Sequence, residues 1–313
     1  LTIIQFMMYN THYRGIKMSA RPFIKWVGGK TQLLPEIRQR YPENITRYCE
    51  PFVGGGAVLF DVLQTFHPNE VLINDINPEL INLYENIRDN CEPLIQLLEH
   101  FQTEYLETPE ADRQNLYLGK RATYNHFIEE RNPEHNLEKA ALFIYLNKTC
   151  FNGLYRVNRN GLFNVPFNRA KNPLICDAEN IRECSQLLQN VQMHVGDYSY
   201  CGDFIDENTF VYLDPPYRPL TESSSFTSYN ENGFSDVQQI ELGNFITEMA
   251  HKGALIVASN SDPHNANEQD EFFDNLYADF NIERVQAARM VNSNARRRGP
   301  INELLISNIA AVF

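Results

Sequence analysis

Apolar and polar residues along the chain fall into short blocks that predict an α/β fold. Apolar runs of strand length lie at 45–50, 70–75, 191–195, 209–213, 254–259, 280–287 and 303–308. Runs with the apolar spacing of a helix lie at 56–66, 77–90, 235–250 and 267–277. Strands that alternate with helices over short connections are typical of a parallel sheet. We therefore expect an α/β domain built on such a sheet.

The predicted helix at 77–90 carries its own start signal. Asn77 is a preferred N-cap residue, because its side-chain oxygen accepts hydrogen bonds from the first N–H groups of a helix. Pro78 suits the first helical position, where its missing N–H would have no partner. We expect this helix to start directly after Asn77.

The pattern changes between residues 92 and 176. Helical runs, such as 137–149, lead into a loop-rich stretch at 150–173 that is rich in Asn and basic residues and contains no acidic residue. We interpret this part as an insertion and a candidate ligand-binding subdomain. The expected division is an N-terminal extension at 1–20, an α/β domain formed by 21–91 and 177–313, and the insertion at 92–176.

The composition narrows the class of protein. A formal net charge of -13 argues against a protein that coats nucleic acid non-specifically, because phosphate binding depends on Lys and Arg. It leaves room for a DNA enzyme with a local basic groove. No run approaches the roughly 18 consecutive apolar residues that a membrane span requires.

The cysteines and the first residues suggest a reduced compartment. Cysteines at 49, 91, 150, 176, 184 and 201 form no CxxC pair and no Cys/His cluster of the kind that binds zinc. We expect reduced, mostly buried thiols and no metal site. Residues 1–17 lack the charged start and the uninterrupted apolar run of a signal peptide, which favours a cytoplasmic protein.

The stretch EPFVGGGAVLF at 50–60 places three glycines between a strand and a helix. Gly54, Gly55 and Gly56 permit positive φ and let a ligand approach the backbone closely. Asp75 ends the next strand, about 20 residues on, where a carboxylate can bind ribose hydroxyls. This arrangement indicates a nucleoside site, but the spacing is not G-x-G-x-x-G. A plain tight turn, with Asp75 as a turn residue or helix cap, is the alternative.

A second glycine pair lies upstream, in FIKWVGGK at 23–30. Lys25, Trp26 and Lys30 flank it, and a lysine beside exposed backbone N–H groups can hold a carboxylate or a phosphate. Taken alone, the segment would serve equally well as a surface turn.

The stretch FVYLDPPYRPL at 210–220 sets Asp214 and Tyr217 on either side of a rigid corner. An apolar strand runs into two prolines, which stiffen the turn that follows. Such stiffness suits polar groups that must be in position before a reaction begins. The alternative is a proline-stiffened turn with a packed tyrosine and no chemistry.

Taken together, these motifs resemble those of the Dam-type adenine-N6 DNA methyltransferases (D12 class, alpha group), including phage and restriction-modification relatives. The matching motifs, in the order of that family, are FIKWVGGK, EPFVGGGAVLF, NDIN, FNGLYRVN, FNVPF, VGDY, DPPY and FTSY. The resemblance runs from Arg21 to the C-terminus. It implies a Rossmann-like S-adenosylmethionine-dependent methyltransferase sheet with a mainly helical DNA-recognition insertion.

The resemblance assigns the catalytic corner to Asp214, Pro215 and Tyr217. Asp214 and the Pro215 carbonyl would accept the two hydrogens of the adenine N6 amino group and aim its lone pair at the methyl group. The base must leave the duplex for this, and Tyr217 would stack on the flipped-out adenine. S-adenosyl-L-methionine would be the methyl donor and S-adenosylhomocysteine the product.

The resemblance also implies how the donor is held. Asp75 would bind its ribose, and Asp197 of VGDY would accept from its adenine amino group, with Tyr198 alongside. Taken alone, Asp197 is more typical of a turn. The residues expected to bind the donor are Trp26, Gly28, Lys30, Phe52, Gly54, Gly55, Gly56, Asp75, Asp197, Tyr198 and Asp214.

Basic and aromatic residues interleave at 147–171, which matches the recognition hairpin of the family. Arg156 matches the residue that reads guanine in a GATC site, and an arginine fork is the commonest reader of guanine O6 and N7. The residues expected to contact DNA are Lys25, Lys148, Phe151, Asn152, Arg156 and Arg169, with Phe151 and Asn152 as wedges. A solvated charged face is the alternative for the charges, and core packing for Phe163 and Phe167.

Ala170 departs from the family pattern. Many relatives carry an aromatic residue there, near the target, so GATC specificity stays open. The arginines at 296–298 would touch phosphate or cover a sheet end, and the polar loop at 225–234 would close over the substrate.

Three other functions compete with this interpretation. A relative of the same fold could modify cytosine N4 or an RNA base, although Asp before PPY favours adenine. A catalytically silent DNA-binding module would not need the donor motifs, and a nicotinamide oxidoreductase leaves DPPY and the basic insertion unexplained.

The expected partner is double-stranded DNA, bound by a monomeric, DNA-associated enzyme of the prokaryotic or phage-infected cytoplasm that uses neither metal nor membrane. Any cognate restriction endonuclease would share the DNA site without binding the enzyme. Protection against restriction and a regulatory role remain equally open.

Overall fold

The computed structural model describes residues 20–219, 234–287 and 301–309. Three expectations fall on the other residues: the N-terminal extension except Ala20, the arginines at 296–298, and the polar loop at 225–234 except Phe234.

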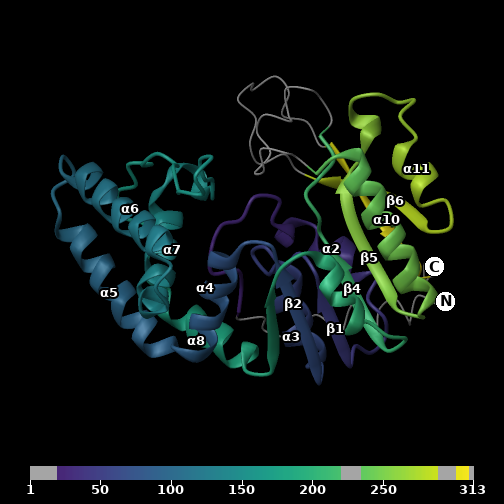
Figure 1. The fold of residues 1–313 in the computed structure, drawn as a ribbon, viewed down its shortest axis with the longest axis horizontal. Helices are drawn as coiled ribbons and strands as arrows, with labels where there is room; N and C mark the ends of the chain where they lie inside the picture. Colours follow the sequence, from purple (N-terminus) through teal and green to yellow (C-terminus); the bar gives the residue numbers. More distant parts are fainter. Residues whose placement is uncertain (1–19, 220–233, 288–300, 310–313) are drawn as a thin grey trace.

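Within the described residues a seven-stranded sheet forms the centre of the molecule, in the order β3-β2-β1-β4-β5-β7-β6 (Figure 1). The strands are β1 Arg47–Glu50, β2 Glu70–Asp75, β3 Val191–Val195, β4 Thr209–Leu213, β5 Leu255–Ser261, β6 Asn281–Ala287 and β7 Ile301–Ser307. The first five pair in parallel, and β7 runs antiparallel between β5 and β6. The predicted α/β fold is confirmed.

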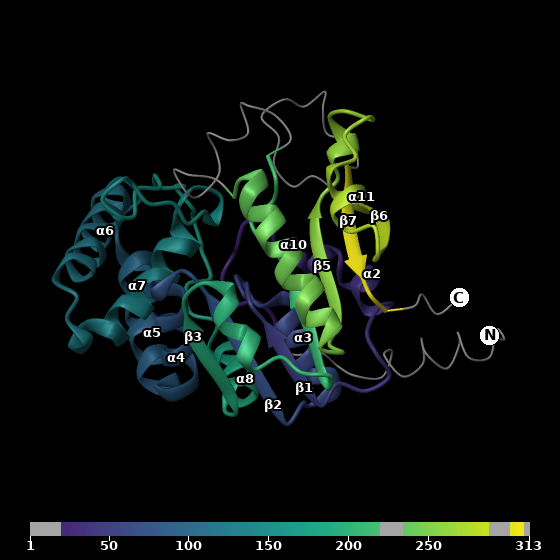
Figure 2. The same ribbon diagram turned by 45° about the vertical axis from the view of Figure 1, so that its right-hand side comes forward.

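Helices cover both faces of this sheet. Those that the structure describes are α2 Leu34–Arg38, α3 Ala57–Phe66, α4 Pro78–Asp89, α5 Cys91–Glu107, α6 Arg113–Glu130, α7 Asn136–Thr149, α8 Ala178–Leu188, α10 Asp236–His251 and α11 Phe272–Leu276. Short 3-10 helices are η1 Lys30–Gln32, η2 Pro133–His135, η3 Phe151–Gly153, η4 Tyr198–Asp203 and η5 Pro263–Asn265. Helix α10 runs along one face, where Leu242 and Ile246 share an apolar cluster with Val211 and Ile256 (Figure 2).

The start of α4 follows the local sequence. Asn77 Oδ1 accepts hydrogen bonds from Glu79 N at 3.0 Å and Leu80 N at 3.3 Å, and Pro78 is the first helical residue. The predicted N-cap is confirmed, which also fixes where the chain turns after β2.

The predicted helix at 267–277 is wrong over its first half. The helix is only Phe272–Leu276, because Asp270 is drawn into other bonds. One of its carboxylate oxygens accepts from Phe272 N at 3.1 Å, and the other pairs with Arg218 at 2.6 Å. Turn contacts made by Asn267 and Asp270, together with the ion pair to Arg218, therefore take the place of helical bonds before Phe272.

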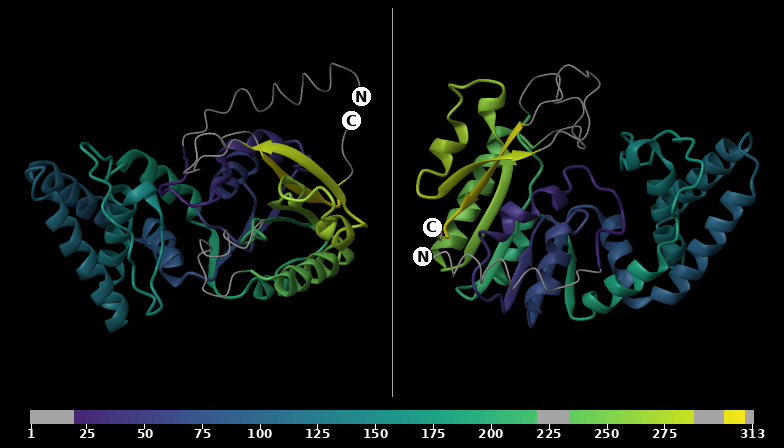
Figure 3. Two further views of the ribbon diagram at one scale, coloured as in Figure 1. Left: turned by 90° about the horizontal axis from the view of Figure 1, so that it is seen from above. Right: turned by 180° about the vertical axis from the view of Figure 1, so that it is seen from behind.

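Helices α5, α6 and α7 form a layer at the β3 end of the sheet (Figures 1 and 3). A single apolar cluster joins Ile73 and Leu83 of the sheet region with Phe143 and Tyr145 of α7, so the layer shares a core with the sheet. After α7 the chain folds back on itself, with Cys150 opposite Phe167 in an antiparallel bridge.

The loops that carry the sequence motifs leave the same edge of the sheet. Strands β1 to β4 run in parallel, so the turns after Glu50, Asp75, Val195 and Leu213 all lie at their carboxyl ends. This edge is where ligands bind in open α/β sheets.

Candidate active site

Asp75 ties two strand ends together. Its Oδ2 accepts a hydrogen bond from Gly54 N at 3.1 Å, and its Oδ1 accepts one from Asn77 N at 3.0 Å. Burial raises the pKa of this carboxyl above its usual value, against the opposing effect of the backbone N–H groups. Each carboxylate oxygen can accept more than one bond, so a ribose hydroxyl would add to these contacts.

The two glycine segments predicted separately form one packed unit through Trp26. A Cβ at Gly54 would lie 2.8 Å from Trp26 Cδ1, and one at Gly55 would lie 3.0 Å from Trp26 Cβ. Gly54 and Gly56 have φ of 47° and 72°, a region that favours glycine. The glycines are therefore required by both conformation and close approach.

Asp214 follows β4 directly and has two polar partners. Its Oδ2 lies 2.9 Å from Lys30 Nζ, and its Oδ1 accepts a hydrogen bond from Ser259 Oγ at 2.9 Å. Lys30 is only 4% exposed and also donates to the Gly28 carbonyl. The ion pair fastens the glycine turn at 28–30 to the corner at Asp214.

Tyr217 lies beyond the two prolines and faces the same ammonium. Lys30 Nζ lies 4.7 Å from the centre of its ring, within the range of a cation–π contact. The Tyr217 hydroxyl donates to Glu303 Oε2, on β7, at 2.6 Å. Burial raises the pKa of this hydroxyl well above its usual value, and the charges of Asp214 and Glu303 add to the effect.

Two amide side chains hold the corner in place. Gln239 Nε2 donates to the Pro216 carbonyl at 3.0 Å, and Asn260 Oδ1 accepts from Arg218 N at 3.2 Å. The two amides also bond to each other, from Asn260 Nδ2 to Gln239 Oε1 at 3.1 Å, and both residues are buried. Hydrogen bonds thus fix the corner in addition to its prolines.

The region around Asp197 is aromatic. The Phe52 and Tyr198 rings lie 5.5 Å apart, and Tyr198 meets Phe245 edge-on at 5.2 Å. Asp197 Oδ1 accepts from Ser199 N at 3.0 Å and caps η4. Asp197 therefore stabilises the start of η4. The proposed contact with the donor would be an additional role of the same side chain.

The structure brings Lys25 next to the predicted DNA wedge. Phe151 is 51% exposed, and Asn152 has a positive φ of 56° in the tight turn η3. Gly153 completes this turn and lies against Lys25, since a Cβ there would lie 2.7 Å from Lys25 Cβ. Residues more than a hundred positions apart thus share one surface.

The remaining predicted DNA contacts differ in exposure. Arg156 is exposed and donates to Asn164 Oδ1 at 2.7 Å, and Arg169 is exposed with a φ of 58°. Lys148 is half-buried, and burial lowers its pKa although the charge of Asp177 raises it. The two arginines are therefore better placed than Lys148 to meet a phosphate or a base.

Some residues of the site carried no recognisable signal in the sequence. Ser259, Gln239, Asn260 and Glu303 meet the corner only because of how distant strands and helices pack. Ile76 is different, since an apolar residue directly after Asp75 at a strand end could have been noticed. It is 68% exposed, and it offers an apolar surface beside the proposed ribose site.

The described part of the chain offers neither a metal site nor a membrane-spanning helix. Residues 20–219, 234–287 and 301–309 contain no group of three or more His, Cys, Asp or Glu side chains able to hold a metal ion. Within those ranges no helix combines the length and apolarity needed to cross a membrane. All six cysteines are free thiols.

The family model for D12 class N6 adenine-specific DNA methyltransferases matches residues 26–291. This range contains both glycine turns, Asp75 and the corner at Asp214. The chain belongs to this family. It is an adenine-specific DNA methyltransferase, and its mostly parallel sheet is consistent with the Rossmann-like fold of such enzymes. The resemblance drawn from the motifs is confirmed.

Individual relatives carry two kinds of name. The chain is 43% identical to the Type II methyltransferase M.MjaIII of Methanocaldococcus jannaschii, over 93% of this chain and 100% of that one. It is 40% identical to the Type II methyltransferase M1.LlaDCHI of Lactococcus lactis, over 93% and 96%. It is 31% identical to the DNA adenine methylase of Escherichia coli K12, over 91% and 94%.

One solved structure, a precorrin 8w decarboxylase of Methanobacterium thermoautotrophicum, matches 93% of this chain and 96% of that chain. The TM-score is 0.36 and the identity 13%, values too low to indicate a shared fold or function.

Gly54→Ala should disturb Trp26, with Gly161→Ala as the matched control. Both glycines have positive φ, so alanine costs about 1 kcal/mol of backbone strain at either position. Only at Gly54 does the new Cβ press on the indole, because nothing lies within 4 Å of a Cβ at Gly161. Trp26 is the only tryptophan of the chain, so its fluorescence should shift in Gly54→Ala alone. Identical emission in both variants would contradict this packing.

Glu303→Leu should lower the rate of methyl transfer about tenfold, which corresponds to about 1.4 kcal/mol in the activation free energy. The reason is that the Tyr217 hydroxyl loses its acceptor, so its ring is no longer held in one position. Glu303→Gln keeps an acceptor and should retain most of the activity. Adding Tyr217→Phe to Glu303→Leu removes the orphaned hydroxyl and should recover part of the loss. Steady-state kinetics test this, and full activity in Glu303→Leu would show that the contact is dispensable.

Proposed function

We propose that this enzyme transfers a methyl group from S-adenosylmethionine to N6 of an adenine flipped out of duplex DNA, within GATC. The supporting observation is the cluster of Asp214, Lys30 and Tyr217 beside the packed glycine turns. A carboxylate, the face of an aromatic ring and a rigid corner meet there, at the edge of the sheet where ligands bind.

The residues around the glycine turns fit this donor. The turn at Gly54 leaves room for close approach, Asp75 supplies a carboxylate for a ribose, and exposed Ile76 supplies an apolar surface. When bound, S-adenosylmethionine would supply an electrophilic methyl group on its sulfonium. The proposed donor contacts are Trp26, Gly28, Lys30, Phe52, Gly54, Gly55, Gly56, Asp75, Asp197, Tyr198 and Asp214.

Asp214 and the Pro215 carbonyl would act on the adenine. The N6 lone pair is delocalised into the ring, so the nitrogen is a poor nucleophile. Two acceptors on its hydrogens draw it towards sp³ geometry and direct the lone pair at the methyl carbon. Transfer would form a bond between N6 and the methyl carbon, break the bond from that carbon to sulfur, and leave the electron pair on sulfur. Asp214 or water then takes the extra N6 proton.

Lys30 would have two duties in this site. With Ser259 it binds the oxygens of Asp214, so the carboxylate has a defined orientation. The ammonium of Lys30 also lies over the face of the Tyr217 ring. The flipped adenine would stack on the same face, so Lys30 would have to move when the base enters. The carboxylate of the donor would offer that ammonium a new partner.

We propose that residues 92–176 are the target-recognition subdomain, inserted into a catalytic domain formed by 21–91 and 177–313. Exposed Phe151 and Asn152 would wedge into the duplex, while Lys25 approaches from the catalytic domain. Arg156 would read guanine, and Arg169 and Lys148 would add positive charge. We further propose a monomeric enzyme that binds no restriction endonuclease, whether or not one shares its site.

Transfer of a labelled methyl group to two plasmids tests the proposed site. One plasmid is unmodified, and the other is already methylated at every GATC. We expect incorporation into the first alone, which would also show that Ala170 does not change the target. Equal incorporation into both would place the target elsewhere, and incorporation into neither would remove duplex DNA as the substrate.

Arg156→Ala should relax discrimination at one base pair of the site, by about 1–3 kcal/mol. Arg159→Ala removes an equal charge from the same exposed loop and should weaken binding to every sequence alike. Methylation rates on single-base variants of the site compare the two. An unchanged preference in Arg156→Ala would remove its assigned role.

A further inference from the structure

Asn147, near the end of α7, joins the turn at 151–153, which the proposed function assigns to DNA, to a segment in which Lys25 is assigned to DNA and the next residue, Trp26, to the donor. Its Oδ1 accepts from Lys25 N at 2.9 Å, and its Nδ2 donates to the Lys25 carbonyl at 2.8 Å and the Gly153 carbonyl at 2.9 Å. The residue is 3% exposed. One buried amide therefore holds the backbone beside Trp26 and the turn that carries Phe151 and Asn152.

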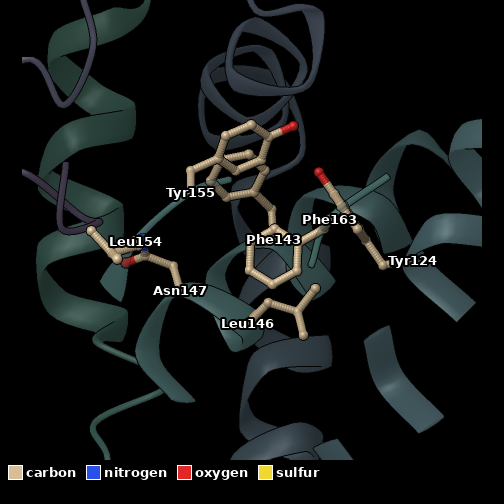
Figure 4. Close-up of a pocket in the computed structure, with 7 residues that line it drawn as sticks. All are labelled: Tyr124, Phe143, Leu146, Asn147, Leu154, Tyr155 and Phe163. Carbon is tan, nitrogen blue, oxygen red and sulfur yellow. The ribbon is translucent and has the colours of Figure 1, made fainter. Parts of the chain in front are cut away.

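A stack of aromatic rings reinforces this junction. The Tyr155 ring lies 5.8 Å from that of Trp26 and 5.0 Å from that of Phe143, with interplanar angles of 26° and 11°. Figure 4 shows Tyr155 over Phe143, with Asn147 and Leu154 beside them. The space between the side chains of this cluster has no room for a water molecule. The contact is thus direct, and close-packed groups transmit displacement rather than absorb it.

Each side of the junction is in direct contact with residues that the proposed function assigns to a ligand, the donor on one side and DNA on the other. Trp26 lies against Gly54 and Gly55, on the donor side. Tyr155 is the neighbour of Arg156, the proposed guanine reader, on the DNA side. We call the loop-rich stretch at 150–173 the recognition loop. A shift of Trp26 on donor binding would therefore reach this loop through the ring of Tyr155 and the amide of Asn147.

We propose that Asn147 is a positioning residue that couples donor binding to DNA recognition, with Tyr155 as the second link. This inference rests on the proposed function. Donor contacts that hold Trp26 against the glycine turn also hold the turn at 151–153 in one position. Coupling of this kind is reciprocal, so DNA should raise donor affinity by the same factor as the donor raises DNA affinity.

Asn125 provides a matched control. Its Oδ1 accepts from Phe163 N at 2.8 Å and its Nδ2 donates to the Phe163 carbonyl at 3.0 Å, which is the same chemistry between α6 and the recognition loop. These bonds join α6 to Phe163, whose ring lies 5.8 Å from that of Tyr155, and neither of them reaches Lys25 or Trp26. Loss of Asn125 therefore removes similar backbone bonds to the same loop but leaves the Asn147 bonds to Lys25 and the contact of Tyr155 with Trp26 in place.

The test measures the dissociation constant of a duplex with one target site, with and without saturating S-adenosylhomocysteine, which prevents turnover. The ratio of the two constants is the coupling factor. We expect about 5–150-fold in the wild type and in Asn125→Ala, the usual range of such couplings. In Asn147→Ala the factor should fall to near 1, while S-adenosylhomocysteine still binds.

Tyr155→Leu keeps an apolar side chain in the cluster but removes the ring that stacks on Trp26. This variant provides the test if Asn147→Ala does not fold. Its coupling factor should fall as well. Addition of the duplex alone should change Trp26 fluorescence in the wild type and in Asn125→Ala, but not in Tyr155→Leu.

A coupling factor near 1 in an active wild-type enzyme would overturn the inference. A factor in Asn147→Ala or Tyr155→Leu equal to that of Asn125→Ala would also overturn it. Failure of the proposed function is a different result, in which the wild type binds no S-adenosylhomocysteine and methylates no duplex.

Discussion

The ammonium of Lys30 is almost completely removed from water, and a buried charge is costly unless an opposite charge and hydrogen-bond partners meet it. Asp214 and the Gly28 carbonyl supply these partners, and the ring of Tyr217 lies above the same group. The requirement brings the first glycine turn to the end of β4. Once these loops meet, the carboxylate, the aromatic face and the donor-side turns share one region.

The second constraint is the closeness of Trp26 to the glycine turn after β1. Glycine is required at 54 and 56, where a Cβ would lie 2.8 Å from the indole and still closer to the Tyr84 hydroxyl, respectively, and it is favoured at 55, where a Cβ would lie 3.0 Å from Trp26 Cβ. Trp26 in turn stacks on Tyr155 of the recognition loop. One tryptophan therefore lies between the part of the enzyme that would hold the donor and the part that would read DNA.

Local signals were enough to predict much of the fold. The strands at 70–75, 191–195 and 209–213 and the start of α4 follow from apolar runs, Asn77 and Pro78, since each depends on neighbours in the sequence. The motif order was enough to predict the family. The helix predicted at 267–277 is wrong over its first half, where turn contacts of Asn267 and Asp270 and the ion pair with Arg218, some fifty residues away, replace helical bonds.

The sequence could not show which polar side chains packing brings into contact with the site residues. Ser259 on Asp214, Glu303 on Tyr217 and Asn147 on Lys25 are all single polar residues on buried or half-buried elements. Each is an ordinary residue in its own sequence context. Their roles arise only when β5, β7 and α7 take their places beside the corner and the glycine turn.

Methyl transfer by Asp214→Asn tests the central claim most directly. Asparagine has the same shape, and its Oδ1 can still accept from Lys30 while its Nδ2 donates to Ser259 Oγ, so the side chain should keep its orientation while the charge is lost. The Lys30 ammonium then lacks its opposite charge, so the variant should be less stable, and transfer is measured at a temperature at which its circular dichroism matches that of the wild type. We predict that duplex binding stays within about threefold of the wild type, whereas single-turnover transfer falls by about a thousandfold or more. Transfer close to the wild-type rate would contradict the assignment of Asp214 as the group that activates the adenine.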